Sequence, residues 1–103
     1  MTTRERNAMQ KFFNRLTEYD NERDRYFAEL QELNAKNGDG SRWCSAEHNL
    51  HELEKICKDE RIINRAREAY RRYEQANGKL DLLHEFGFEL AELNFWKHDR
   101  ATL

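Results

Sequence analysis

The sequence predicts an all-α fold: a small helical bundle of three long or four shorter helices, forming a single domain over residues 1–103. The first observation behind this prediction is that the chain contains no proline and no valine. Strands are rich in valine, isoleucine and threonine, and proline interrupts helices, so this composition favours helices. The second is that apolar residues recur at alternating three- and four-residue steps, which is typical of helices packed along one face.

The charge and the aromatic content of the chain indicate that it folds, and they exclude some classes of function. The 18 basic and 20 acidic residues leave a formal net charge of −2, and 12% of the residues are aromatic. Disordered chains combine a large net charge with few aromatic residues, so we expect order here. The same balance excludes a histone-like polycation and an acidic DNA mimic. No signal peptide or membrane-spanning run is apparent, so we expect a cytoplasmic protein.

The first predicted helix covers about residues 3–36. Arg23 interrupts its heptad-spaced stripe, which comprises Met9, Phe12, Leu16, Tyr19, Tyr26, Leu30 and Leu33, with Phe13 and Phe27 widening it. A helix of this length spans about 50 Å, whereas a compact domain of about 100 residues has a radius of gyration near 13 Å. Part of the helix therefore protrudes or meets a second chain, and we expect a homodimer.

A glycine-containing loop over residues 37–44 is followed by a helical segment over residues 45–77, for which Ser45 is a suitable N-cap. The apolar residues of this segment fall on two faces that are rotated by roughly 110°. Two arrangements explain this: one helix with two packing faces, or a break near residues 58–61 with Asp59 capping a new helix. We favour the break.

Asn77-Gly78 is predicted to end this segment, because both residues tolerate the left-handed geometry that closes many helices. We expect a last helix over about residues 79–98. Gly87 inside it suggests a kink or the close approach of a neighbouring backbone. Phe88 and Phe95 fall on a different side from the main apolar stripe, which comprises Leu82, Leu83, Phe86, Leu90 and Leu93.

Metal binding has one candidate group. Cys44, His48 and His51 would lie above one another if the helix began by residue 45, and thiolate and imidazole are preferred zinc ligands. However, Cys57 would project from the opposite side, and no second ligand pair has zinc-finger spacing. We therefore predict no metal and no cofactor, with Cys57 as a small core residue.

A basic stripe is the candidate for nucleic-acid binding. Its members fall within about 60° of one another on a helix, and are Lys58, Arg61, Arg65 and Arg72. Such a row matches phosphates, or equally a carboxylate-rich protein surface. Glu60, Glu68 and Glu74 interleave with it and are spaced for ion pairs. A solvated, salt-bridged face is the favoured interpretation, and nucleic-acid binding is the alternative function.

Four large aromatic residues outside or beside the main stripes are the candidates for protein binding: Trp43, Phe88, Phe95 and Trp96. Tryptophan is enriched among the residues that dominate binding energies. The competing interpretation is that a short chain uses every large side chain in its core. The two interpretations are evenly balanced for Trp43, whereas for Phe88 and Phe95 we favour an interface, the dimer interface included.

No catalytic motif is apparent. Ser41 and Ser45 lie in no nucleophile motif, and Gly38 and Gly40 lack the residues of a phosphate-binding loop. We therefore expect a non-enzymatic protein-interaction module that binds and modulates another macromolecular complex. Small, charged, helical proteins of this style are typical of phages and mobile elements, whose accessory proteins include inhibitors of host defence nucleases.

Overall fold

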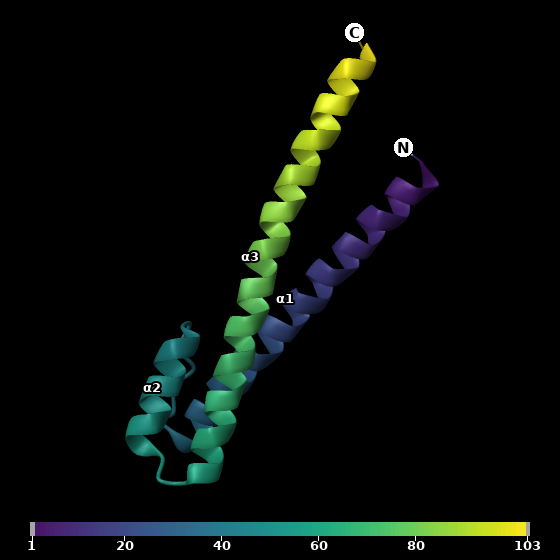
Figure 1. The fold of residues 1–103 in the computed structure, drawn as a ribbon. Helices are drawn as coiled ribbons and strands as arrows, with labels where there is room; N and C mark the ends of the chain where they lie inside the picture. Colours follow the sequence, from purple (N-terminus) through teal and green to yellow (C-terminus); the bar gives the residue numbers. More distant parts are fainter. Residues whose placement is uncertain (1, 103) are drawn as a thin grey trace.

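The computed structural model describes the backbone of residues 2–102 and the side chains of residues 2–87. This part of the chain folds into three helices and contains no strand: α1 (Thr3–Asn37), α2 (Ala46–Ile56) and α3 (Glu60–Thr102) (Figure 1). The predicted all-α fold is therefore confirmed, in its three-helix form. The molecule is elongated, with extents of 67 × 20 × 16 Å and a radius of gyration of 19.6 Å.

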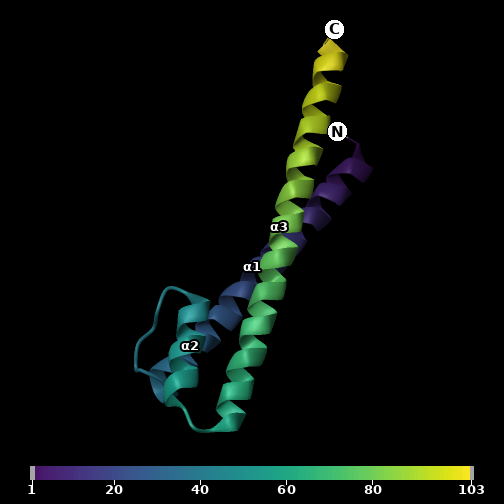
Figure 2. The same cartoon turned by 60° about the vertical axis from the view of Figure 1, so that its left-hand side comes forward.

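Helices α1 and α3 form a long antiparallel hairpin, and α2 packs against only one end of it (Figures 1 and 2). Three aromatic contacts fix the direction: Phe12 lies near Phe86, Lys79 stands over the ring of Tyr19, and Phe27 packs near Tyr73. Along these contacts the residue numbers rise on α1 and fall on α3, so the two helices are antiparallel. We call the end that includes α2 the head, and the remainder of the hairpin the stalk.

The core of the head combines large side chains on α1 with alanines on α3. Leu30 and Leu33 are buried with Ala66 and Ala69, and α2 adds further buried residues to the same cluster, namely Ala46 and Leu53. Small side chains let helices approach closely, and the leucines fill the space between them. Arg23 interrupts the α1 stripe, as the sequence indicates, and its guanidinium lies 3.3 Å from carboxylate oxygens of both Asp20 and Asp24.

The chain breaks between α2 and α3 at residues 57–59. Asp59 caps the helix that follows, because its carboxylate accepts a hydrogen bond from the Arg61 backbone N–H at 2.9 Å. Its carbonyl accepts from the Ile63 N–H at 3.1 Å. The break lets the two apolar faces of residues 45–77 contact one core, with Leu53 and Cys57 on one side and Ala66 on the other.

The predicted helix end at Asn77-Gly78 is wrong, and so is the separate helix over residues 79–98. Helix α3 runs without interruption from Glu60 to Thr102. Gly40 is the only glycine in the described chain with a positive φ, so Gly78 does not adopt the helix-closing geometry. Ala76 and Leu80, on either side of Gly78, are both buried. A continuous helix keeps both in the seam, and this burial offsets the cost of about 1 kcal/mol for glycine in a helix.

Replacing Ala66 by leucine tests the close packing of α1 on α3. Ala66 is fully buried, so Ala66→Leu should lower the free energy of unfolding by about 1–3 kcal/mol through overpacking. Urea unfolding followed by circular dichroism measures the change. The control is Asn64→Leu at an exposed position of the same helix, which should change stability by less than about 0.5 kcal/mol. Equal effects of the two substitutions would contradict the described packing.

Candidate protein-binding site

Two buried asparagines fasten the loop between α1 and α2 to the head. Asn34 near the end of α1 and Asn49 in α2 are both fully buried, and their side chains lie 3.4 Å apart, with the Asn34 amide donating to the Asn49 oxygen. The Asn34 amide also donates to the Asp39 carboxylate at 2.8 Å and to the Ser41 carbonyl at 3.0 Å. The loop therefore folds back over the end of α1 in one defined path.

Asn49 holds the backbone of Trp43 from both sides. Its side-chain oxygen accepts from the Trp43 N–H at 3.0 Å, and its amide donates to the Trp43 carbonyl at 2.8 Å. Gln31 of α1 donates a further bond to that carbonyl at 2.9 Å. Among the described residues, no buried side-chain nitrogen or oxygen lacks a hydrogen-bond partner. A fully satisfied polar cluster of this kind gives the loop a single conformation.

The Trp43 side chain is fixed as firmly as its backbone, yet it remains accessible. Its indole N–H donates to the Asp39 carboxylate at 2.7 Å, and the His48 ring meets it edge-on with centroids 4.4 Å apart. Trp43 is nevertheless 40% exposed. Beside it on the loop, Arg42 pairs with Glu32 of α1 at 2.8 Å. The head thus presents one ordered aromatic surface next to an ion pair.

Asp39 is the ionisable group that holds Trp43 in place. Burial alone would raise the pKa of Asp39, but hydrogen bonds from the Ser41 N–H, the Trp43 indole and the Asn34 amide lower it below the ordinary 3.8. The carboxylate is therefore the form that the folded loop stabilises. Similarly, a hydrogen bond from Arg42 lowers the pKa of Glu32.

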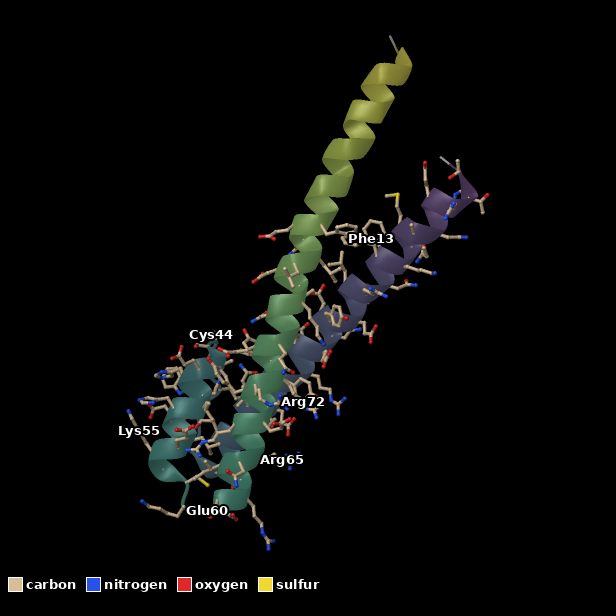
Figure 3. All side chains as sticks on the ribbon, in the orientation of Figure 1. Phe13, Cys44, Lys55, Glu60, Arg65 and Arg72 are labelled. Atoms are coloured by element: carbon tan, nitrogen blue, oxygen red, sulfur yellow. The ribbon has the colours of Figure 1, made fainter. Side chains whose placement is uncertain are left out.

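A second accessible apolar area lies along the stalk. Leu82 is 68% exposed, Phe86 is 52% exposed and Phe13 is 53% exposed. Figure 3 shows Phe13 on the N-terminal half of α1, well away from α2. The sequence placed Leu82 and Phe86 on the main packing stripe of the last helix. The structure corrects this for Leu82, whereas the Phe86 ring lies 6.3 Å from that of Phe12 on α1 and is half-exposed beside the seam. Leu80 is buried and Leu83 is half-buried.

The other sequence-predicted binding residues are not brought together with Trp43. Phe88, Phe95 and Trp96 belong to the last part of α3, and their side chains lie outside the described residues. Trp43 belongs to the head loop. The predicted aromatic set therefore divides between the two ends of the molecule, and only its Trp43 part has a described geometry.

The basic stripe is largely engaged within the chain. Arg65 pairs with Glu29 of α1 at 2.7 Å, and Arg72 pairs with Glu68 at 2.9 Å and donates to the Tyr26 hydroxyl (Figure 3). Hydrogen bonds from Arg71 and Arg72 lower the pKa of Glu68 to about 2. Lys58, in the break before α3, and Arg61, in the first turn of α3, are both exposed. The stripe exists as a surface, but carboxylates interleave with its arginines.

The cysteine and histidine residues weighed as metal ligands do not assemble. Cys44 precedes the N-cap Ser45 and is exposed, and His48 packs against Trp43. Within the described residues, no group of three or more histidine, cysteine or acidic side chains is arranged to hold a metal ion.

Comparison with protein-family models, with curated proteins and with solved structures gave no match for this chain. None of the helices in the described residues is long and apolar enough to cross a membrane.

Removing the Asn49 side chain tests the role of the asparagine pair. Asn49→Ala removes the hydrogen bonds that the Asn49 side chain makes with the Trp43 N–H, the Trp43 carbonyl and the Asn34 amide, and each such bond contributes about 0.5–1.5 kcal/mol. We expect the free energy of unfolding to fall by about 2–3 kcal/mol in urea titrations. Asn21→Ala, on the exposed face of α1, should change it by less than about 0.5 kcal/mol. If Asn49→Ala lowered the free energy of unfolding by no more than Asn21→Ala does, the asparagine pair would not stabilise the head.

The pH dependence of the loop tests the role of Asp39. A carboxyl group whose folded pKa is lowered stabilises the fold above its unfolded pKa, and this stability disappears as pH falls through the folded pKa. The loop should therefore remain closed at pH 3.8, the ordinary pKa of aspartate, and loosen only below it. Trp43 fluorescence in a Trp96→Phe background measures this. Asp39→Asn, which cannot titrate, should lack the transition, and a transition of the parent at or above pH 3.8 would contradict the assignment.

Proposed function

We propose that this protein is a non-enzymatic interaction module that binds another protein through the head surface centred on Trp43. The observation that carries the proposal is the combination of restraint and exposure at Trp43. Its backbone and its side chain are both held by hydrogen bonds, yet the residue is 40% exposed. A tryptophan used only for packing is normally buried much further.

Pre-organisation supports this role. Ordering a loop and immobilising a side chain oppose association, and a surface that is already rigid avoids most of that cost. Tryptophan is also enriched among the residues that dominate binding energies, usually within a rim of polar contacts. The Arg42–Glu32 pair and Gln31 supply polar groups next to Trp43.

The biological role that we propose is modulation, by inhibition for example, of a macromolecular complex in the cytoplasm, where unpaired cysteines such as Cys44 and Cys57 persist. The analogy with phage and mobile-element accessory proteins, including inhibitors of host defence nucleases, rests on size and composition. The structure adds one supporting feature, which is a small rigid head on a long stalk.

Nucleic-acid binding through the basic stripe has weaker support. Carboxylates of Glu29 and Glu68 accept from Arg65 and Arg72. A phosphate that approached these arginines would be repelled by the carboxylates, or would have to displace them from the arginines. The head surface is therefore the primary proposal.

Capture of binding partners from native extract tests for a protein partner and for a nucleic-acid partner in one experiment. The tagged full chain and its Trp43→Ala variant are compared, each with and without nuclease. We expect a discrete protein that survives nuclease, and a dissociation constant at least tenfold weaker for Trp43→Ala once the partner is purified, because truncating a central tryptophan costs about 2 kcal/mol or more. Arg42→Ala is the matched control on the same loop and should change the affinity much less.

The experiment distinguishes protein binding from nucleic-acid binding. If nuclease abolishes recovery of the bound material, and if changing Arg61, Arg65 and Arg72 together to glutamate does the same, the function is nucleic-acid binding. Equal binding by the parent and by a folded Trp43→Ala variant would remove the head surface from the interface. If the identified partner is an enzyme or part of one, its activity should fall on addition of the parent and not on addition of Trp43→Ala.

A further inference from the structure

We infer that the head surface accepts a basic side chain of the partner protein, an arginine in preference to a lysine, which stacks on the open face of Trp43 beside the Asp39 carboxylate. The inference rests on the proposed function, because it names the chemistry of the partner at the same site. Three observations support it: a negative charge that the chain does not neutralise, an accessible indole ring beside that charge, and a free hydrogen-bond position on the carboxylate.

The Asp39 carboxylate is held in place without a basic partner. Its three hydrogen-bond donors are the Asn34 amide at 2.8 Å, the Ser41 backbone N–H at 2.9 Å and the Trp43 indole N–H at 2.7 Å, all of which are uncharged. Within residues 2–87, no lysine or arginine forms an ion pair with this carboxylate. A charge that is fixed in position and not neutralised attracts a cation at short range.

The basic residues nearest to this loop in the sequence are paired elsewhere. Arg42 lies 2.8 Å from a carboxylate oxygen of Glu32, and Lys36 lies 3.9 Å from the other oxygen of the same group. Figure 2 shows the loop at the outer edge of the head, where a partner can reach it. The loop and α2 together carry more acidic than basic residues, namely Asp39, Glu47, Glu52 and Glu54 against Arg42 and Lys55. A basic partner surface is therefore complementary to this part of the head.

The Trp43 ring is the kind of surface on which cations stack, and the chain leaves it accessible. Tryptophan attracts a cation over its face more strongly than tyrosine or phenylalanine does. Inside the molecule this contact is made at a tyrosine, where the Lys79 ammonium lies 5.0 Å from the centroid of the Tyr19 ring. Among the described side chains, no lysine or arginine stands over Trp43, which contacts the His48 ring and is 40% exposed. The hydrogen bond from its indole N–H to a carboxylate also polarises the ring in favour of a cation.

The hydrogen bonds of Asp39 favour arginine over lysine as the occupant. A carboxylate can accept about four hydrogen bonds, and Asp39 accepts three, two at Oδ1 and one at Oδ2. The remaining position is on Oδ2, the oxygen that accepts from the indole N–H of Trp43. A guanidinium stacks on aromatic rings and donates from its edge to carboxylates, whereas an ammonium has no plane to stack. An arginine therefore suits the ring and the carboxylate together.

Two small probes test the inference without a purified partner. N-acetylargininamide and its uncharged analogue N-acetylcitrullinamide are titrated into the full chain with Trp96→Phe, at equal ionic strength, while NMR follows the Trp43 indole N–H resonance. We expect a saturable shift with the arginine compound and a dissociation constant on the order of 100 mM. The citrulline compound should bind at least about fivefold more weakly, because it has the same shape without the charge.

Asp39→Asn tests the part played by the carboxylate. It removes the negative charge beside Trp43, so the preference for the arginine compound over the citrulline compound should fall to about twofold or less. Glu54→Gln is the matched control, since it removes the same charge from an exposed position near the other end of α2. It should leave the preference unchanged. The comparison of the two probes on the parent chain decides the question even if Asp39→Asn disturbs the loop.

The failure of this inference is distinguishable from the failure of the proposed function. Equal affinities of the two probes for the parent would overturn the inference. If Trp43→Ala nevertheless abolished capture of a protein, the head surface would remain the interface, with an uncharged group on Trp43. If the parent preferred the arginine compound but captured its partner independently of Trp43, the basic site would be supported and the proposed function would fail.

Discussion

The structure depends on a mismatch of helix lengths. Helices α1 and α3 contain 35 and 43 residues, whereas α2 contains 11 and covers only one end of the hairpin. Three helices can enclose a core, but two helices share only a single seam and leave their outer faces in water. The buried cluster around Leu30, Leu53 and Ala66 therefore lies where α2 is present, and apolar side chains such as Leu82 and Phe86 remain exposed where it is absent.

This mismatch divides the molecule into two parts with different physical character. In the head, the Asn34–Asn49 pair satisfies buried polar groups, fixes the loop and holds the backbone of Trp43. The binding role that we propose for Trp43 needs such rigidity, and the three-helix core provides it. In the stalk, packing along one seam is supplemented by Phe12 against Gly87 and by Lys79 over Tyr19.

The local rules of helix formation made much of the fold predictable, and tertiary packing made the rest unpredictable. The heptad spacing of α1 and the capping by Asp59 were accessible from the sequence because each depends on residues close together in the chain. The end predicted at Asn77-Gly78 was wrong because burial of Ala76 and Leu80 outweighs the weak propensity of glycine to stop a helix. Trp43 was a candidate on residue type alone. Its anchoring by Asn49 was missed, since no local pattern distinguishes a buried asparagine from an exposed one.

The division of the molecule into a three-helix head and a two-helix stalk implies that the head is the more stable part. Hydrogen exchange measured by mass spectrometry tests this most directly, because it reports local opening segment by segment. We expect strong protection for residues 26–34, 46–56 and 62–70 in the head, and weaker protection for residues 5–20 and 79–87 in the stalk. Protection of the stalk that equals that of the head would contradict this division.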